Sequence, residues 1–406
     1  TTDFTKTLFT KAGENGEITD RSLSLKDYAG KTIRLAFRNI SNDKFLIAID
    51  DILVFDAQNR DAALASSDVK KYVLKGGEAE ISYSIKNTGL NTINQMELEW
   101  SDGLESHTDL LTGLNVKFFE TYSGTFKTKV SVEDASQIDI TAKIVSVNGL
   151  PDSVLENNIN TLVVRGLENA IPLKMVVEEA TGTWCGWCPR GAVNMEKMRE
   201  KYPDEFIGIA VHNEDPMMVQ DYNDGLTGLP GFGGFPSVII NRSAIEDPAD
   251  METILLENIR QDYGPVAVNA TGTFNGRTIT VDASVDFNTQ FVNEDLKLIA
   301  VLVEDGVKGT TAGFNQTNYY ANNAAGVMGG FEALPDPVPA SQMVYDEVGR
   351  ELIFGFEGRT NTFSTEINAG DFADLSFDVD VPTAYNINNV YVVVMVADAA
   401  GAILGG

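Results

Sequence analysis

The chain has 406 residues and is strongly acidic, with 59 Asp and Glu against 30 Lys and Arg and a net charge of -29. This balance disfavours nucleic acids and anionic membrane surfaces as partners, because both are bound through basic patches. It admits calcium-binding loops, for which we find no supporting motif. Hydrophobic residues make up 43% of the sequence, which is typical of a folded protein with several cores.

No apolar run reaches the roughly 18–20 residues that a membrane span requires. The best candidate, residues 390–404, is short and is interrupted by Asp398. The first residues are polar and show no signal peptide, so we interpret the sequence as mature or trimmed protein. The chain has only two cysteines, which suits an exported redox protein because no stray thiol can mispair. A cytosolic protein could be equally poor in cysteine.

Residues 1–66 show the alternation of strands. Ile33, Leu35 and Phe37 share one face of a predicted strand, and residues 45–55 form a denser apolar run that predicts a buried strand. The stretches YAGKTIRLAFRN and LIAIDDILVF resemble the end of the jelly-roll domains of bacterial surface adhesins. We therefore expect a partial jelly-roll domain whose earlier strands lie outside this sequence. The alternative is a small β cap without a binding role.

Residues 67–166 begin with a linker and continue with period-two strands. Apolar residues alternate over 79–85, 96–100 and 138–144, and Gly, Asn and Asp mark the turns between these runs. This spacing favours an immunoglobulin-like β-sandwich. The segments KNTGLNTI and VNGLPDSVLENN resemble extracellular spacer modules of bacterial surface proteins, so we expect a spacer without chemistry.

The two cysteines, Cys185 and Cys188, form a Cys-x-x-Cys motif between a predicted strand at 173–179 and a predicted helix at 190–202. This position places one sulfur at the N-terminal end of the helix. Unpaired backbone N–H groups and the helix dipole favour a thiolate there, and the thiolate is the attacking species in disulfide exchange. Pro189 suits the first helical turn, where its missing N–H is not needed.

Two other interpretations of the motif stay open. A Cys-x-x-Cys motif alone is only moderately specific, so a structural disulfide is one alternative. Half of a zinc site is the other, but zinc usually needs four ligands, and the only histidines are His107 and His212. We interpret these as a surface and a structural residue, and we expect no metal site. Trp184 and Trp187, which flank Cys185, and the preceding Glu179 favour the redox interpretation.

The segment WCGWCP resembles the thioredoxin active site. The predicted elements that follow have the matching order: a strand at 206–212, a helix at 217–225, then GGFPS and a strand at 238–241. The resemblance implies a thioredoxin-like domain over residues 167–263.

The same resemblance implies that Pro236 is cis and faces the cysteines, and that Glu179 is a buried acid that assists proton transfer. Trp187 stands where thioredoxin has proline, so the redox poise stays open. More narrowly, EEATGTWCGWCPRG, VHNEDPM, GGFPS and NQTNYY are similar to the Omp28-related outer-membrane protein family of Gram-negative bacteria, from about residue 170 onward. This implies export to the periplasm, the outer membrane or the cell surface.

Residues 264–406 return to β patterns, with alternation over 279–287 and 375–381 and apolar runs at 296–303 and 390–396. We expect a C-terminal β-sandwich domain. An irregular region, rich in Asn, Gly and Pro, lies at 306–343. Long ordered loops are disproportionately functional, so we expect this region to flank the cysteines or the domain junction.

The sequence thus predicts a multidomain protein, with a thioredoxin-like α/β domain flanked by all-β domains of jelly-roll and immunoglobulin-like type. The predicted function is an exported or cell-surface thiol–disulfide oxidoreductase that acts on protein thiols and disulfides through its own disulfide, without a cofactor. The alternative is a surface adhesion or binding protein that uses the α/β domain as scaffold and binds other cell-surface proteins. The expected site residues are Cys185 as nucleophile, Cys188 as resolving thiol, Glu179 as proton acceptor, and Trp184, Trp187, Phe235 and Pro236 as walls of the substrate groove.

Overall fold

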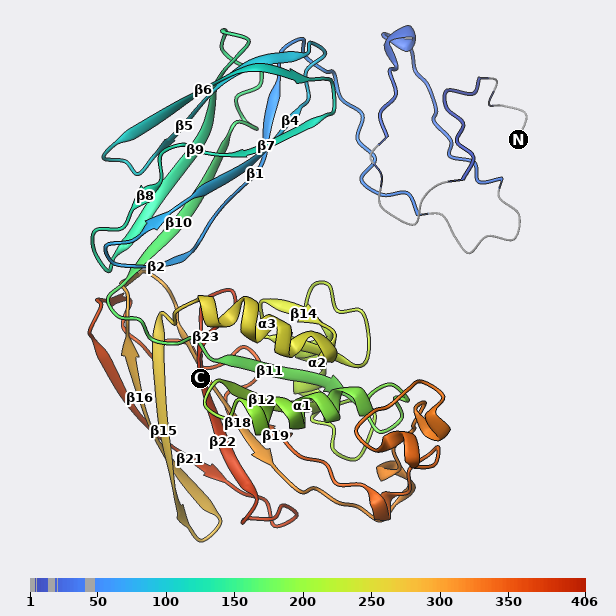
Figure 1. Ribbon diagram of the computed structural model, residues 1–406, viewed down its shortest axis with the longest axis vertical. Helices are drawn as coiled ribbons and strands as arrows, with labels where there is room; N and C mark the ends of the chain where they lie inside the picture. Colours follow the sequence, from blue (N-terminus) through green and yellow to red (C-terminus); the bar gives the residue numbers. More distant parts are fainter. Residues whose placement is uncertain (1–3, 5, 14–18, 20, 41–47) are drawn as a thin grey trace.

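The computed structural model describes residues 4, 6–13, 19, 21–40 and 48–406. Figure 1 shows three parts along the chain: an irregular N-terminal stretch, an elongated β module, and a larger unit that holds all the α-helices. Within the described residues the longest helix, α1, has 13 residues, so none of these helices has the length and apolar character to cross a membrane.

The described residues before Ala62 contain no strand, only the short 3-10 helix η1 (Lys26–Tyr28). The apolar side chains that were expected to face a core, such as Ile33, Leu35 and Phe37, are exposed. The prediction of a jelly-roll domain is therefore not confirmed, and its second strand lies partly outside the described residues. A strand needs a neighbouring strand for its backbone N–H and C=O groups, and the described residues of this stretch belong to none of the sheets.

Residues 62–167 form a β module in which two main sheets enclose one core. The sheet orders are β1-β4-β7 and β2-β10-β9-β5-β6, with a small pair β3-β8. Trp100, Ile81 and Ile85 are among its buried residues. The strands are β1 (Ala62–Val69), β2 (Tyr72–Leu74), β3 (Glu78–Ala79), β4 (Ile81–Asn87), β5 (Ile93–Ser101), β6 (Ser106–Val116), β7 (Thr121–Thr125), β8 (Val130–Ser131), β9 (Gln137–Val147) and β10 (Ile159–Leu167).

The larger unit is built on an eight-stranded sheet of order β14-β13-β11-β12-β19-β18-β22-β23. Its first strands and the helices are β11 (Met175–Thr181), α1 (Pro189–Lys201), β12 (Phe206–His212), α2 (Gln220–Thr227), β13 (Ser237–Ile240), β14 (Ala244–Glu246) and α3 (Met251–Glu257). The later strands are β18 (Lys297–Glu304), β19 (Val348–Leu352), β22 (Val390–Ala397) and β23 (Ile403–Gly405). Six 3-10 helices lie between these elements: η2 (Pro248–Asp250), η3 (Ile259–Gln261), η4 (Ala312–Phe314), η5 (Ala321–Asn323), η6 (Phe331–Ala333) and η7 (Ala340–Gln342).

The predicted fold class, an α/β domain of thioredoxin type flanked by separate all-β domains, is wrong. The structure is mostly β, with 39% strand and 13% helix. The segment that was expected to close on itself instead shares one continuous sheet with the C-terminal part, because β12 pairs with β19 and β18 pairs with β22. Apolar strands on both sides of the junction bury their faces in this sheet, so the hydrophobic pattern alone does not show that they belong together.

A second, three-stranded sheet packs beside the first. Its order is β15-β16-β21, and its buried face contributes to a core with β18 and β22. These strands are β15 (Val266–Asn275), β16 (Thr278–Phe287) and β21 (Phe372–Asp380), with the pair β17 (Phe291–Val292) and β20 (Glu366–Ile367) nearby. Figure 1 shows β15 of this sheet beside β22 of the eight-stranded sheet.

Strand β11 is buried on both faces and lies in the interior of the sheet. Met175 and Val177 join the core that contains side chains of α1 and α3, whereas Val176 joins the core that contains Tyr222 of α2. Successive side chains of a strand point to opposite faces, so the pair Glu178-Glu179 is divided between these two cores.

Candidate functional site

The cysteines lie in the loop between β11 and α1 and form a disulfide. Cys188 occupies the N-cap position of α1 and Pro189 its first turn. The Cys188 N–H donates to the carbonyl of Cys185, and the Gly191 N–H donates to that of Cys188. Both cysteines are buried, with 4% of Cys185 and 2% of Cys188 exposed. The loop therefore places a buried disulfide at the N-terminus of α1.

Glu179 is buried on the α1 side of the sheet. Its Oε1 has no hydrogen-bond partner, and the carboxyl group lies against the backbone of Gly191 in the first turn of α1. Burial raises the pKa of Glu179 to about 8, the Thr181 side chain lowers it, and the charge of Glu347 raises it further. The sequence expectation of a buried acid near the cysteines thus corresponds to a carboxyl group one turn from Cys188 that holds a proton near neutral pH.

A second buried acid, Glu347, lies close to the same face of the sheet. Burial raises the pKa of Glu347 to about 7, against a lowering by Arg199. Arg199 of α1 also approaches Asp305 and Asp346, at 3.6 Å each. These residues were not among the expected site residues, because they come from distant segments that only the shared sheet brings together.

The first aromatic wall of the site joins Trp184 to the loop before β13. The Trp184 indole N–H donates to the carbonyl of Asn213 at 2.8 Å, and its ring meets Phe235 edge-on with centroids 5.5 Å apart. Phe232 packs on Phe235 in turn. Pro236 is buried and follows Phe235 through a cis peptide bond. Trp184 stays 46% exposed, so this wall offers apolar surface to a partner.

The second aromatic wall joins Trp187 to a distant segment. The ring of Trp187 meets those of Tyr319 and Tyr320 edge-on, with centroids 5.5 Å apart in both cases. Trp187 is 45% exposed and Tyr319 50% exposed. The two tyrosines were not among the expected site residues. The sequence feature that could have indicated them is the NQTNYY motif, of which they are the last two residues.

Tyr319 and Tyr320 belong to a segment that we call the strap, residues 308–344. An isolated bridge between Val307 and Tyr345 closes its base, and Val338 and Met343 of the strap belong to a small core that also contains Met217 and Val348. Figure 1 shows the strap as the orange loops beside the N-terminal end of α1. The expectation that the irregular region at 306–343 flanks the cysteines agrees with this placement.

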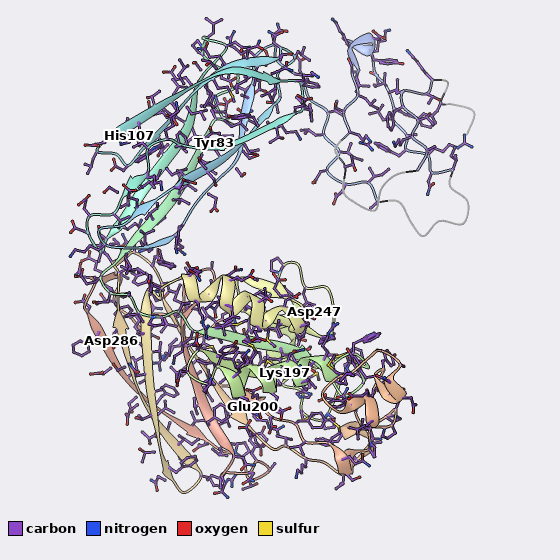
Figure 2. All side chains as sticks on the ribbon, viewed as in Figure 1. Tyr83, His107, Lys197, Glu200, Asp247 and Asp286 are labelled. Atoms are coloured by element: carbon purple, nitrogen blue, oxygen red, sulfur yellow. A yellow bond between two sulfur atoms is a disulfide. The ribbon has the colours of Figure 1, made fainter. Side chains whose placement is uncertain are left out.

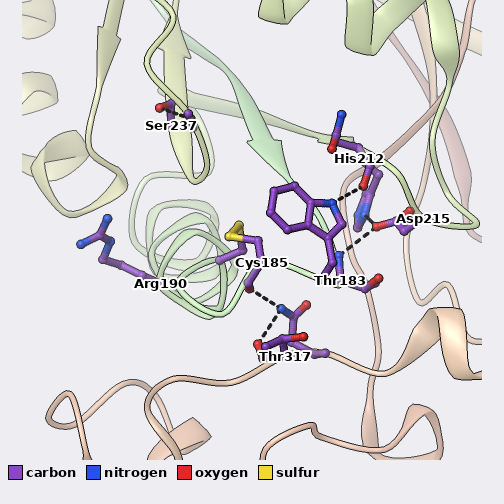
Figure 3. Close-up of a disulfide and its surroundings, with 12 residues drawn as sticks. Thr183, Cys185, Arg190, His212, Asp215, Ser237 and Thr317 are labelled. Atoms are coloured by element: carbon purple, nitrogen blue, oxygen red, sulfur yellow. Dashed lines mark hydrogen bonds and ion pairs between the residues drawn. A yellow bond between two sulfur atoms is a disulfide. The ribbon is translucent and has the colours of Figure 1, made fainter.

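A buried His–Asp pair supports the cysteine loop from the other side (Figure 3). Asp215 Oδ2 lies 2.6 Å from His212 Nδ1 and accepts the backbone N–H of Thr183 at 3.0 Å. Asp215 Oδ1 accepts the N–H of Met217. The carboxylate thus fixes the chain two residues before Cys185.

His107, the second histidine, lies on β6 in the other module, against the ring of Trp100 (Figure 2). His107 is therefore not brought near the cysteines, whereas His212 is linked to their loop through Asp215. Among the residues that the structure describes, no group of three or more His, Cys, Asp or Glu side chains could hold a metal ion.

Comparison with known proteins gives one family match. Residues 226–404 match the family model described as outer membrane protein Omp28. The match covers less than half of the chain; it contains Phe235 and Pro236 but neither Cys185 nor Cys188. The predicted resemblance to this family is confirmed for that range, whereas the thioredoxin-like and jelly-roll resemblances are not confirmed. None of the curated proteins matches the chain.

Similar solved structures include two with low similarity. One is the crystal structure of a protein from Agrobacterium tumefaciens, at 16% identity and a TM-score of 0.33, over 59% of this chain and 93% of that one. The other is the CARDB domain of a Pyrococcus furiosus protein in complex with di-metal ions, at 16% identity and a TM-score of 0.23, over 30% of this chain and 100% of that one. At these TM-scores the likeness carries no argument about this chain.

Proposed function

We propose that the protein exchanges thiols and disulfides with protein substrates through Cys185 and Cys188. One observation carries the proposal: the disulfide sits at the N-terminus of α1, and the buried carboxyl group of Glu179 lies against Gly191 in the first turn of the same helix. A helix N-terminus stabilises a thiolate, and an acid whose pKa is raised to about 8 is close enough to a thiol in pKa to exchange a proton with it.

In the reducing direction, the Cys185 thiolate attacks a sulfur of the substrate disulfide. A bond forms between Cys185 and the substrate, the substrate S–S bond breaks, and one substrate thiolate leaves. Glu179, in its ionised form, then accepts the proton of Cys188, and the Cys188 thiolate attacks the Cys185 sulfur. The second substrate thiolate leaves and is protonated, and the Cys185–Cys188 disulfide remains. The substrate gains two electrons and the protein loses two; a substrate dithiol drives the reverse sequence.

The aromatic walls support a polypeptide substrate. Trp184 with Phe235 on one side and Trp187 with Tyr319 on the other present exposed apolar surface around a buried disulfide. A peptide segment can gain affinity from such surfaces, while a small thiol gains little from them. The family match supports a location in the cell envelope, where disulfides persist.

The test is insulin reduction by dithiothreitol, followed as turbidity, with the wild-type chain and a Cys185→Ser/Cys188→Ser double variant. The wild type is expected to accelerate precipitation, and the double variant to match the uncatalysed rate. A Cys188→Ser variant should accumulate a mixed disulfide with the substrate, because the resolving thiol is missing. Equal rates for wild type and double variant would remove the proposal.

One observation favours a second candidate, a surface binding protein in which the disulfide is a structural staple. Both cysteines are less than 5% exposed in the disulfide form. A staple of this kind would resist dithiothreitol in the folded protein. Quantification of free thiols after mild reduction separates the two functions, since exchange requires that the disulfide opens without unfolding.

A further inference from the structure

The motif Asn315-Gln316-Thr317-Asn318-Tyr319-Tyr320 of the strap lies directly on the cysteine loop. The Thr317 N–H donates to the Thr183 carbonyl at 2.8 Å, and the Tyr319 N–H donates to the Gly186 carbonyl at 3.0 Å. The strap is thus joined by main-chain hydrogen bonds to residues on both sides of Cys185. Thr183 also donates a hydrogen bond to the strap, from its hydroxyl group to the carbonyl of Gly313 at 2.8 Å.

Gln316 contacts the cysteine itself. Its side-chain amide donates to the carbonyl of Cys185 at 2.9 Å and to that of Thr317 at 3.0 Å (Figure 3). Gln316 is 5% exposed, and its backbone exchanges two hydrogen bonds with Val338, at 3.0 and 2.8 Å. The amide is therefore a buried donor held on a rigid base and directed at a backbone atom of the nucleophilic residue.

Two side chains of the motif, those of Asn315 and Asn318, hold the strap together instead of contacting the cysteine loop. Asn315 Oδ1 accepts the N–H of Ala340 at 2.8 Å. The Asn318 side-chain amide donates to the carbonyl of Phe331 at 2.8 Å, and its oxygen accepts the N–H of Tyr320. The side chains of Asn315 and Asn318 thus shape the strap, whereas Gln316 hydrogen-bonds to the cysteine loop and the two tyrosines pack on Trp187.

We propose that Gln316 is a positioning residue that sets the reduction potential of the Cys185–Cys188 pair. The carbonyl of Cys185 takes one hydrogen bond from within the loop, from the Cys188 N–H, and one from Gln316. The second bond fixes the peptide plane that carries the Cys185 side chain. Two thiols held in bonding geometry have a high effective concentration, which favours the disulfide over the dithiol. The proposal rests on the proposed function, since it requires a disulfide that cycles.

The experiment equilibrates the full chain with reduced and oxidised glutathione and measures the fraction of disulfide after acid quench and thiol labelling. Gln316→Met keeps the length of the side chain and removes both N–H donors. The loosened loop is expected to lower the equilibrium constant for disulfide formation about tenfold, which makes the reduction potential about 30 mV more positive. Gln316→Asn, in which the amide recedes by one methylene, should shift it in the same direction and serves if Gln316→Met does not fold.

Asn315→Ala is the matched control, because it removes a side-chain bond within the strap and none to the cysteine loop. A shift for the Gln316 variants with an unchanged potential for Asn315→Ala supports the proposal. Equal shifts for Gln316 and Asn315 variants would overturn it in favour of general strap stability, and so would an unchanged potential in the Gln316 variants. A wild-type disulfide that glutathione and dithiothreitol cannot reduce would instead refute the proposed function. The two failures are therefore distinguishable.

Discussion

The carboxyl group of Glu179 lies against the backbone of Gly191, so closely that a Cβ added at Gly191 would overlap Oε1. The glycine in the first turn of α1 thus provides the space in which the buried acid of β11 sits. Without that space the acid would have to leave its position near Cys188 or displace the helix that carries the cysteine.

Gly191→Ala should therefore destabilise the protein by about 1–3 kcal/mol, the usual cost of overpacking a filled interior. Urea denaturation followed by circular dichroism measures the change in the free energy of unfolding. The double variant Gly191→Ala/Glu179→Ala should recover part of the loss, because the overlapping carboxyl group is removed. If the two substitutions add without coupling, the contact does not determine the fit of α1 on β11.

The raised pKa of Glu179 predicts how stability depends on pH. The carboxyl group has a pKa of about 8 when folded and an ordinary value of 4.5. Between these values the folded state binds the extra proton, so this group's contribution to stability is greatest below about 4.5 and is lost as the pH rises through 8. The slope from one proton is about 1.4 kcal/mol per pH unit.

Glu179→Gln removes this dependence and should make the free energy of unfolding flatter between pH 5 and 8. Glu347, whose pKa is raised to about 7, contributes in the same direction and remains in the variant. Exposed Glu257, at the end of α3, gives the matched control Glu257→Gln. An unchanged slope for Glu179→Gln would show that the carboxyl group is already ionised when folded.

The local elements around the cysteines could be predicted from the sequence. The apolar run at 173–179, the proline after Cys188 and the helical spacing to Tyr202 give β11 and α1 within a few residues. Glu179 and both tryptophans lie beside the cysteine loop, where sequence proximity places them, and their roles in exchange stay a prediction.

The features that the sequence could not predict depend on contacts between segments that lie far apart in the chain. Ala210 of β12 pairs with Val348 of β19, and this contact makes one sheet of two predicted domains. Nothing in the alternation of either strand specifies its neighbour. Gln316 and Tyr319 reach the cysteine loop from more than a hundred residues away through a segment with few regular elements. In the sequence, the sign of such contacts is a polar motif inside a long ordered loop, but the motif does not indicate which segment it contacts.

Asp215 should prove essential for the conformation of the cysteine loop. Its carboxylate is buried with His212 and accepts the Thr183 N–H, so Asp215→Ala removes a partner from a buried pair and orphans a backbone donor. We expect a loss of about 3–5 kcal/mol in the free energy of unfolding. Asp221→Ala, at an exposed position of α2, should change it by less than about 0.5 kcal/mol.

The same variant should alter the cysteines before it unfolds the protein. In native conditions, reduced Asp215→Ala should react faster with iodoacetamide than reduced wild type, since the loop that buries both sulfurs loses an anchor. Mass spectrometry of peptides counts the labelled cysteines. Labelling at the wild-type rate in a folded variant would show that Asp215 supports only the neighbouring turn.

The junction between the β module and the larger unit depends on Arg165. This side chain, 2% exposed, donates to the Gln290 carbonyl and pairs with Glu294, and its guanidinium lies over the ring of Phe291 at 4.9 Å. Arg165→Met should cost about 1–3 kcal/mol, because the Gln290 carbonyl loses its donor, whereas the Glu294 side chain, which is 30% exposed, can be solvated. Near the same junction, Lys75 pairs with Glu168 with both side chains 44% exposed, so Lys75→Met should cost at most about 1 kcal/mol.

The measurement is limited proteolysis at residues 167–172 together with urea denaturation. Arg165→Met should expose that segment to cleavage and separate the unfolding of the β module from that of the larger unit, whereas Lys75→Met should leave one transition as in the wild type. If both variants behave alike, Arg165 does not couple the two parts.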